Sequence, residues 1–531
     1  MRNFIGFGAF AFGFSSVIAQ PQFQHIYQSA TSYSLDIIEL PGHNLLTALG
    51  GTLMLNSEGF VTHASSLYNY GTYGAQTIMT ARGNEYYFTS ATIAAPCEPG
   101  STVLSLIRPV LGKMDSLGAV LQMKRYAFEP VLCQGSNGGL EITSDKGALT
   151  WGRDRSFFAL RVDSTLEPVW AKEFIGPGGF QFIKELPEGD LVAGINLQGA
   201  GAVVARLDAE GSILWVKSYM RPRGMVHDAL IEPDGSMVIL GMTDSLNISM
   251  FETLPVWYQP KLFMMKLNGD GQVLWCKGWR NADLRWFPHR PSRIKRTLDG
   301  QYAVLATLGM PQNNLEYRPI LMKTDVNGDT IWTRSVGADG YIYMARSLLV
   351  HSDSGFAFSG IVQGALPNNN TGLCYIFKSD PLGHFECHEQ HYPLETMQLF
   401  PMDSSITIAV EQSVAAAVAI YANDSVVNPD LFTEYDACSI GTDLSSHGER
   451  RAPMSIRPNP NTGHFTLSFA DPLMAESYYS VYDTMGKLLF QRPLPQGKAT
   501  EEVDLSRFGA GTYVVRVTSK EGSCYERVVV E

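Results

Sequence analysis

One segment recurs seven times along most of the chain, and this repeat limits the possible folds more than any other feature. Its clearest copies are LDAEGSILWVKSY (207–219), LNGDGQVLWCKGW (267–279) and TDVNGDTIWTRSV (324–336). Aligned on a turn glycine, the copies fall at 59, 118, 166 (where leucine replaces glycine), 211, 271, 328 and 383. A repeat of 45–60 residues predicts one supersecondary unit per copy.

Each unit is expected to contain four strands. In the fifth copy these are residues 226–232, 236–243, 261–268 and 272–279, which all show the alternating apolar pattern of strands. The Asp-Gly and Asn-Gly-type turns between them suit hairpins, because glycine accepts the positive φ that such turns require. Four antiparallel strands repeated seven times are typical of a β-propeller. The chain resembles WD-repeat and quinoprotein-like propellers in architecture only, since the WD dipeptide is missing.

The number of blades depends on the segments that follow the seventh copy. Residues 397–400, 406–410 and 415–421 show the pattern of three more strands, and residues 23–27 could add a fourth and close the ring. We therefore expect an all-β fold, a seven- or eight-bladed β-propeller over residues 20–438, followed by a small C-terminal β-sandwich.

Four copies carry tryptophan four residues after the anchor, at Trp170, Trp215, Trp275 and Trp332. A large aromatic residue at a fixed strand position in successive blades indicates packing between neighbouring blades. The alternative, a ligand-binding stripe, stays open at this point.

The N-terminus reads as an export signal covering residues 1–19. Met1-Arg2-Asn3 gives a positive start, residues 4–19 are apolar, and Val17-Ile18-Ala19 precedes a predicted cleavage site before Gln20. The run is too short for a membrane anchor, and we expect no transmembrane segment in the mature chain. The seven cysteines would then reach an oxidising compartment, but their spacing gives no pairing.

The last part of the chain is compositionally distinct. Residues 439–452 are polar and rich in turn formers, as in a linker. Residues 453–531 then show β-patterning around PNPNTGHF, VYDTMGK and a basic-hydrophobic ending. The motif residues are Pro458, Asn459, Pro460, Gly463, Gly486, Gly511, Tyr513 and Arg527.

These motifs, in this order, closely resemble the type A C-terminal sorting domain of the type IX secretion system of Gram-negative gliding and oral bacteria. The resemblance implies a small Ig-like β-sandwich that guides the exported protein through the outer membrane. It also implies partners, namely the outer-membrane secretion machinery and a surface sortase, and a location that is secreted or on the cell surface. The sorting domain says nothing about the function of the protein that it exports.

Motifs that carry chemistry are weak in this chain. No G-x-S-x-G, H-E-x-x-H or P-loop stands in a suitable context, so we assign no catalytic residue and no cofactor. His384, Cys387, His388 and His391 lie on what we take as the last strand of the seventh repeat, where alternation would keep them from converging on one metal. Residues 325–329 begin like a calcium loop but lack its later ligands, which favours a hairpin turn.

Loop length is uneven in a way that suggests a binding face. Second-to-third-strand loops and blade-to-blade loops, such as 245–260 and 280–291, are long, and functional residues concentrate on such loops. The ligand-binding candidates there are Trp257, Tyr258, Arg280, Asp283, Arg285, Trp286, His289 and Arg290. Aromatic faces beside arginine suit sugars, acidic glycans or a peptide. The competing interpretation is that these aromatics only pin the loops to the propeller.

We therefore predict a secreted, cell-surface-directed binding or structural module that recognises a glycan, a peptide or a surface partner. The alternative is an extracellular propeller enzyme that degrades polysaccharide or peptide. The net charge of −12, from 40 basic and 52 acidic residues, disfavours nucleic acid as a partner, because binding to it depends on neutralising phosphates.

Overall fold

In the computed structural model the chain forms two compact units, residues 1–438 and 439–531. The structure describes residues 22–28, 36–48, 51–66, 78–93, 107–116, 118–129, 136–153, 157–176, 178–197, 199–219, 224–243, 261–280, 285–286, 292–309, 317–363, 373–390, 394–419, 425–427, 433–439, 454–469, 477–483, 488–519 and 522–531. The predicted signal peptide lies outside these residues. Among them, no helix has the length and apolar character needed to cross a membrane.

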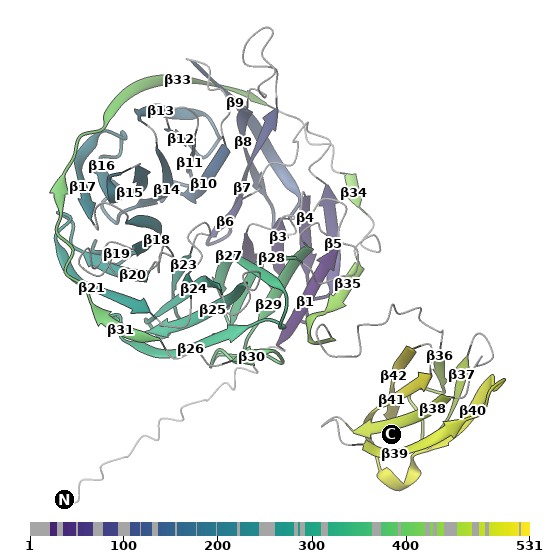
Figure 1. The fold of residues 1–531 in the computed structure, drawn as a ribbon. Coiled ribbons are helices and arrows are strands. Elements are labelled where there is room, and N and C mark those ends of the chain that lie inside the picture. The colour runs from purple at the N-terminus through teal and green to yellow at the C-terminus, as the bar shows by residue number, and fades with distance from the viewer. Residues whose placement is uncertain are drawn as a thin grey trace, which may run out of the picture. The chain divides into compact units, whose positions relative to one another are not determined.

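The first unit is a β-propeller, as predicted (Figure 1). Its described strands form seven four-stranded antiparallel blades, each with its first strand innermost. Blades 1 to 3 are β2 (Ile37–Glu39), β3 (Leu45–Ala48), β4 (Gly51–Leu55) and β5 (Val61–Ser66); β6 (Ile78–Arg82), β7 (Glu85–Ile93), β8 (Ile107–Met114) and β9 (Val120–Glu129); β10 (Ser136–Ile142), β11 (Ala148–Arg153), β12 (Phe157–Val162) and β13 (Pro168–Ile175).

Blades 4 and 5 are β14 (Gly178–Glu185), β15 (Leu191–Leu197), β16 (Gly201–Leu207) and β17 (Ile213–Tyr219); β18 (Met225–Ile231), β19 (Met237–Thr243), β20 (Lys261–Leu267) and β21 (Val273–Arg280). Blade 6 is β23 (Arg293–Arg296), β24 (Tyr302–Gly309), β25 (Tyr317–Thr324) and β26 (Thr330–Val336), and the short β22 (Arg285–Trp286) pairs with β24. Blade 7 is β27 (Ile342–Val350), β28 (Phe356–Gln363), β29 (Leu373–Lys378) and β1 (Phe23–Gln28).

The N-terminal strand closes the ring, as the sequence suggested, but it does so in blade 7 and not in an additional blade with residues 397–421. β1 pairs antiparallel with β29 from Phe23 opposite Lys378 to Tyr27 opposite Cys374, so the fourth strand of blade 7 comes from the other end of the propeller. The segment after Gly383 therefore has no free place in that blade. Our assignment of residues 384–391 to the last strand of the seventh repeat is wrong, because β1 already occupies that position.

After Gly383 the chain instead runs around the outside of the ring (Figure 1). Within the described residues it adds a further strand to the outer edge of every blade. In chain order these strands are β30 (Glu389–Gln390) on β26, β31 (Glu395–Gln398) on β21, β32 (Ser404–Ser405) on β17, β33 (Ala409–Ala419) on β13 and β9, β34 (Ser425–Val427) on β5, and β35 (Thr433–Asp436) on β1. We call residues 384–438 the belt.

The belt corrects the expectation of an eighth blade. Of the three segments predicted as further strands, residues 397–400 overlap β31, and residues 406–410 and 415–421 both overlap β33. These strands pair with blades 5, 3 and 2 instead of with one another. The outer strand of a propeller blade presents unpaired backbone N–H and C=O groups, which otherwise invite aggregation. Because the belt satisfies these edges, its segments are more stable along the perimeter than as a separate sheet.

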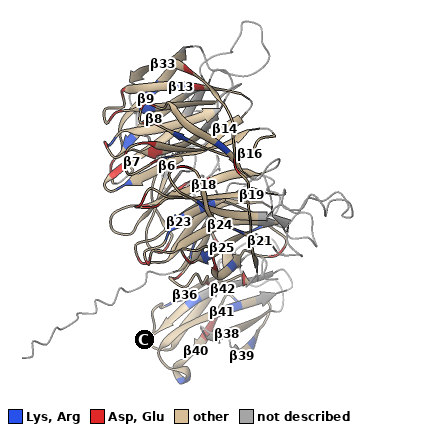
Figure 2. Cartoon of the chain, turned by 90° about the vertical axis from the view of Figure 1, so that its left-hand side faces the viewer, with Lys and Arg blue, Asp and Glu red and all other residues tan. Residues whose placement is uncertain are grey.

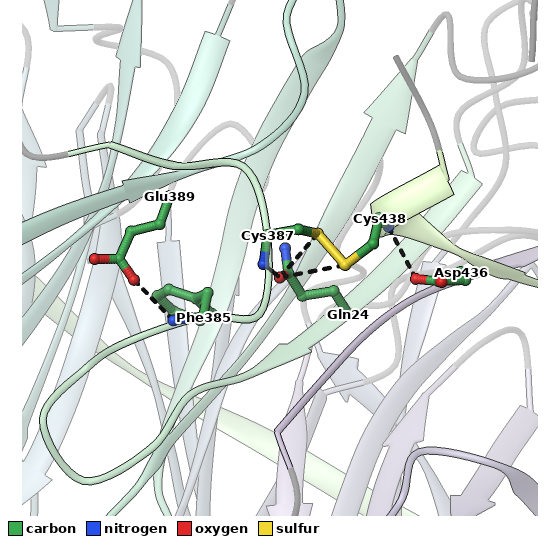
Figure 3. The surroundings of a disulfide bond; sticks show 6 residues. All are labelled: Gln24, Phe385, Cys387, Glu389, Asp436 and Cys438. Carbon is green, nitrogen blue, oxygen red and sulfur yellow. Dashed lines mark hydrogen bonds between the residues drawn. A yellow bond between two sulfur atoms is a disulfide. The ribbon is translucent and has the colours of Figure 1, made fainter. Parts of the chain in front are cut away.

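A disulfide joins the two ends of the belt, Cys387 and Cys438 (Figure 3). The backbone N–H of Cys387 donates to the side-chain oxygen of Gln24 at 2.8 Å, and Gln24 lies on β1 and is buried. The belt ends and the ring-closing strand therefore meet at one point. Cys276 and Cys374 are both buried.

The repeated tryptophans pack between blades, as predicted. A Cβ added to Gly211, in the turn of blade 4, would lie 3.0 Å from the ring of Trp170 in blade 3. The Trp170 indole N–H also donates to the carbonyl of Ala209 in the same turn at 2.9 Å. Trp215, Trp275 and Trp332 lie in the same way under Gly271, Gly328 and Gly383 of the next blade. The turn glycine and the tryptophan of the motif thus form one inter-blade contact.

The second unit is a β-sandwich. One sheet contains β36 (Met454–Arg457), β37 (His464–Phe469) and β40 (Thr500–Asp504), and the other contains β39 (Leu488–Leu494), β38 (Ser477–Asp483), β41 (Gly511–Ser519) and β42 (Gly522–Val530). Its buried core draws on both sheets, for example Phe465 and Leu467 from one and Val481 and Val515 from the other.

Loss of the belt disulfide should destabilise the propeller. For the double variant Cys387→Ser/Cys438→Ser we expect the free energy of unfolding to fall by up to roughly 4 kcal/mol, because a cross-link over 51 residues removes loop-closure entropy from the unfolded chain. Urea denaturation of the full chain measures this change. A Cys276→Ala variant controls for loss of a buried thiol, and it should keep its sensitivity to reducing agent. An unchanged midpoint in the double variant would contradict the locking role.

Candidate functional site

The innermost strands carry a group of charged residues at matching positions. A tight turn follows each inner strand. Because side chains alternate along a strand, the residues two and four places before the first residue of that turn point to the same side. In five blades these positions hold charged side chains, which we call the channel cluster: Asp36, Glu141, Lys184, Asp228, Arg293 and Lys295. Charged residues elsewhere are spread over the strands and turns (Figure 2).

The members of the channel cluster face one another across the central channel. Burial raises the pKa of Asp36 in blade 1. The charges of Arg293 and Lys295 in blade 6 lower this pKa, although less strongly, so both side chains lie near Asp36. Blade 7 separates these two blades along the ring. Lys295 likewise interacts with Glu141 of blade 3, which lies two blades further away. Charges on blades that are not neighbours can influence one another in this way only across the centre of the ring.

A β-bulge recurs where the inner strands enter the channel. In blades 3, 4, 5 and 7 one residue of the inner strand has no partner, and in blade 5 this residue is His227. The facing strand carries a glycine near the bulge: a Cβ at Gly241 would lie 2.2 Å from the carbonyl oxygen of Met225. Bulges re-aim the side chains that follow them. Gly241, on the second strand of blade 5, therefore makes room for the bulge.

Two members of the channel cluster are paired and one is held by backbone. Lys184 Nζ lies 2.8 Å from Glu141 Oε2. Burial alone would lower the pKa of Lys184, but Glu141 and Asp228 outweigh it, and the pKa is raised. Asp228 accepts backbone N–H groups from Ala229 at 2.9 Å and Ile294 at 3.1 Å. These acids are therefore already satisfied by neighbouring groups.

Arg293 and Lys295 differ from these acids. Neither makes an ion pair within 4.0 Å with any residue that the structure describes. The Lys295 side chain is exposed to solvent. Its pKa is nevertheless lowered, mainly by the surrounding protein atoms and to a smaller extent by the charge of Lys184. Lys295 is therefore reachable from solvent although protein atoms surround it. Two cations without a counter-charge make this site able to accept an anion.

His227 supports the wall behind these cations. Its Nδ1 accepts the backbone N–H of Ser292 at 3.2 Å, directly before Arg293. Burial, together with the charge of Arg293, lowers the pKa of His227 to about 4. The ring is therefore neutral at neutral pH and acts as a hydrogen-bond acceptor between blades 5 and 6.

The residues that we predicted for ligand binding lie largely outside the described part of the chain. This holds for Trp257, Tyr258, Asp283, His289 and Arg290. Only the backbone of the other three is described: Arg280 pairs with Glu395 of the belt, and Arg285 and Trp286 pair with Gly309 and Leu308 of β24. Their role in ligand binding stays a prediction. Arg293, which follows the same long loop, lies within the described residues.

The two weak metal patterns have other structures. Cys387 is in the belt disulfide, and His384 Nδ1 lies 3.1 Å from Glu389 Oε1. In the calcium-like segment, Asp325 Oδ1 accepts the backbone N–H groups of Asn327 and Asp329, each at 2.9 Å, as in a hairpin turn.

Sorting-motif residues of the second unit meet at its last strand. The Asn459 side chain donates to the carbonyl of Arg527 at 2.8 Å and accepts the N–H of Val529 at 2.8 Å. Gly463 has φ +98° and packs against Ser506, where a Cβ would lie 2.8 Å from backbone atoms. The Tyr513 hydroxyl donates to the carbonyls of residues 508 and 509. Pro458 and Pro460 both follow cis peptide bonds, Gly511 begins β41, and Gly486 lies outside the described residues.

Acid should destabilise the propeller through His227. As pH falls below 6.5 the unfolded chain gains a proton on this histidine, whereas the folded chain gains it only near pH 4, so stability is lost within that window. The loss should reach roughly 3 kcal/mol. In His227→Gln, whose amide oxygen can accept the Ser292 N–H, this part of the loss should vanish. Denaturation curves measured across the window test this, with the exposed His63→Gln as control; equal acid sensitivity in both variants would refute it.

Asn459 should hold the last strand of the sandwich. In Asn459→Ala two hydrogen bonds to β42 are lost, and we expect a cost of about 1–3 kcal/mol. Amide hydrogen exchange of residues 527–530 in the full chain should accelerate. Arg527→Ala is the matched control, because Asn459 bonds only the backbone of that residue, and unchanged exchange in Asn459→Ala would count against the assignment.

Comparison with solved structures gives low overall similarity. A protein of unknown function from Bacteroides caccae is 11% identical, with 58% of this chain and 93% of that chain covered and a TM-score of 0.35. A structure titled YCF48 bound to D1 peptide is 12% identical, covering 67% and 96%, with a TM-score of 0.36. A DUF4221 family member from Bacteroides vulgatus is 9% identical, covering 71% and 98%, with a TM-score of 0.30.

No curated protein matches the chain as a relative. Residues 455–531 match the family described as Secretion system C-terminal sorting domain, which agrees with the motifs and with the sandwich that they form. The chain thus carries, after its β-propeller, a C-terminal sorting domain of the type IX secretion system, which directs its export to the cell surface or the extracellular space.

Proposed function

We propose that this protein is a secreted binding module whose propeller takes up the acidic end group of a glycan in its central channel. The observation that carries the proposal is the pair of cations, Arg293 and Lys295, which have no acidic partner within 4.0 Å among the described residues of an otherwise paired cluster. Buried or enclosed charges are normally paired. An anionic ligand would supply the missing counter-charge.

Chemistry favours a carboxylate at this position. The planar guanidinium of an arginine matches a carboxylate with two parallel hydrogen bonds, and a lysine two residues further along the same strand adds a point charge. In an enclosed channel such interactions are stronger than on an open surface, because water screens them less. Asp36 and Asp228 on the facing strands would disfavour ligands with several clustered negative charges.

The long-loop face offers the entrance. The inner strands begin on this face, so Arg293, at the start of β23, lies nearer to it than Lys295 does. The loop that precedes β23 contains Trp286, and the neighbouring long loop contains Trp257 and Tyr258. Aromatic rings at the entrance would stack on the neutral sugars that follow an acidic terminal residue. Outer-membrane secretion machinery and a sortase that removes the tail are the proposed partners during export.

A binding screen with the full mature chain tests this function. The probes are oligosaccharides ending in a uronic acid and the matched neutral sugars, with calorimetry on those that bind. We expect acidic sugars to bind and the double variant Arg293→Gln/Lys295→Gln to weaken them by at least tenfold, because a hydrogen bond to a charged group contributes about 1.5–3 kcal/mol. Binding should also weaken on raising pH earlier than for an ordinary lysine, because the pKa of Lys295 is lowered.

Lys172→Gln is the matched control, because this lysine lies outside the channel on β13 and contacts only the Ser212 hydroxyl among described side chains. Equal binding of neutral and acidic sugars, or undiminished binding by the double variant, would refute the channel site. If the protein preferred acidic peptides, its ligand would be a peptide and not a glycan. Release of shortened sugars would establish the competing enzymatic function.

A further inference from the structure

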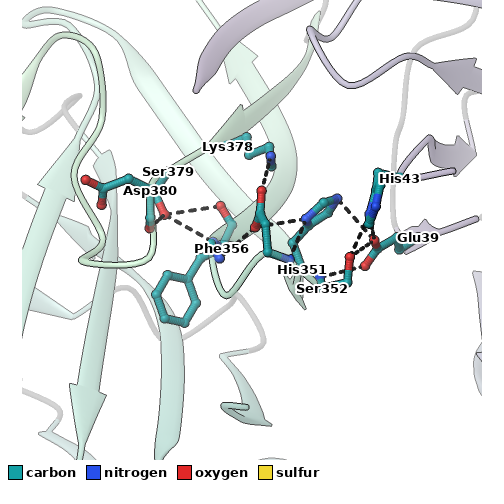
Figure 4. Close-up of polar contacts among 10 residues, drawn as sticks. Glu39, His43, His351, Ser352, Phe356, Lys378, Ser379 and Asp380 are labelled. Carbon is teal, nitrogen blue, oxygen red and sulfur yellow. Dashed lines mark hydrogen bonds and ion pairs between the residues drawn. The ribbon is translucent and has the colours of Figure 1, made fainter. Parts of the chain in front are cut away.

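A second polar cluster lies where the propeller ring closes, apart from the channel cluster (Figure 4). Glu39 ends β2 of blade 1, and His43 lies in the turn that follows. His351 lies in the corresponding turn of blade 7, after β27. The two turns are on the same face of neighbouring blades, so the cluster spans the seam between the first and last blades.

The three side chains converge. One ligand atom from each lies within 4.8 Å of the other two. Glu39 Oε1 is 3.1 Å from His43 Nδ1 and 3.3 Å from His351 Nε2. In a tetrahedral zinc site with bonds of about 2.0–2.1 Å, neighbouring ligand atoms are about 3.3 Å apart. The spacing around Glu39 therefore already suits a zinc-sized ion.

His351 is an unsatisfied buried group. Its side chain is 0% exposed, and its Nε2 has no hydrogen-bond partner of adequate geometry among the described residues, although it points at Glu39. Its other nitrogen, Nδ1, lies 2.9 Å from Asp353 Oδ1, and at 3.3 Å it could instead accept the backbone N–H of Asp353. We take the shorter contact, in which Nδ1 donates to the carboxylate, as the one that is made, because two lone pairs would repel at that distance. In this tautomer the lone pair of Nε2 faces the Glu39 carboxylate.

The surroundings of His351 match those of metal ligands. A ligating histidine commonly donates its second nitrogen to a carboxylate, which fixes the ring and its tautomer. Here Asp353 has this role, and it is itself held by Lys378, whose Nζ lies 2.6 Å from Asp353 Oδ2. Both Asp353 and Lys378 are buried. The ring of His351 is therefore fixed in the orientation that presents Nε2 to Glu39.

We propose that Glu39, His43 and His351 form a binding site for a divalent transition-metal ion of the zinc class. Two imidazoles and one carboxylate suit such an ion, whereas calcium prefers oxygen ligands alone. The Ser352 hydroxyl, 2.7 Å from His43 Nδ1, makes the contact that the ion would replace, and water would complete the coordination. The site would join blade 1 to blade 7 on the face that carries the short turns.

Metal titration of the full mature chain tests the site. After chelator treatment we expect one equivalent of Zn²⁺ to bind and to raise the unfolding temperature, while Ca²⁺ does neither. Co²⁺ should give the visible absorption of a tetrahedral site. His43→Gln is the main variant, because this half-exposed residue can change without disturbing the core, and it should weaken Zn²⁺ binding by at least tenfold.

The matched control is His384→Gln, which removes a histidine from a histidine–glutamate contact of the same length, 3.1 Å, elsewhere on the propeller. It should leave the titration unchanged. His351→Gln supplies a second test where it folds. Absence of Zn²⁺ uptake by the native chain would overturn the proposal. Uptake that survives His43→Gln would overturn it as well.

Discussion

The pairing of β1 with β29 is the contact on which the propeller depends. The ring is formed by one chain, so its first and last blades must be joined. This pairing does so, because the first described strand of the protein becomes the outer strand of the last blade. Every inter-blade contact, including the tryptophans under the turn glycines, requires both neighbours to be present. If β1 detached, blade 7 would lose its outer strand and the seam with blade 1 would open. Both the channel cluster and the proposed metal site at Glu39, His43 and His351 need the closed ring.

The belt adds a second closure around the first. Its strands pair with the outer edge of each described blade, and its last strand, β35, pairs with β1 itself. The disulfide then joins the belt's two ends beside Gln24 of the same strand. Covered edges suit a protein that is exported and works outside the cell, where strand edges of other molecules are available for pairing. The oxidising environment on that route keeps such a disulfide formed.

Local patterns predicted the blades well because hairpins are local. The strands expected at residues 226–232 and 261–268 agree within one residue with β18 and β20. The packing role of Trp170 also followed from its repeat position. The belt could not be predicted in this way, because alternation identifies β31 and β33 as strands but does not name their partners. Their partners are blades that lie far away in the sequence, and the choice depends on which edges remain unpaired.

The candidate sites were missed for a related reason. Lys184 and Lys295 look like ordinary polar positions in their own strands, and only a comparison of the same position across all inner strands gathers them in one channel. That comparison was possible from the repeat alignment, so the channel cluster had a usable signal. Glu39 and His351 had none, because they meet only through ring closure. The long-loop residues around Trp286 remain a prediction.

Peptide mapping of the mature protein without reduction tests the double closure most directly. After proteolysis of the non-reduced chain, mass spectrometry should detect one linked pair of peptides that contains Cys387 and Cys438, and it should disappear on reduction. This result requires that the two ends of the belt lie side by side, as they do when the belt encircles the ring. If Cys387 were found linked to another cysteine, or both thiols were free, the belt could not encircle the ring as described.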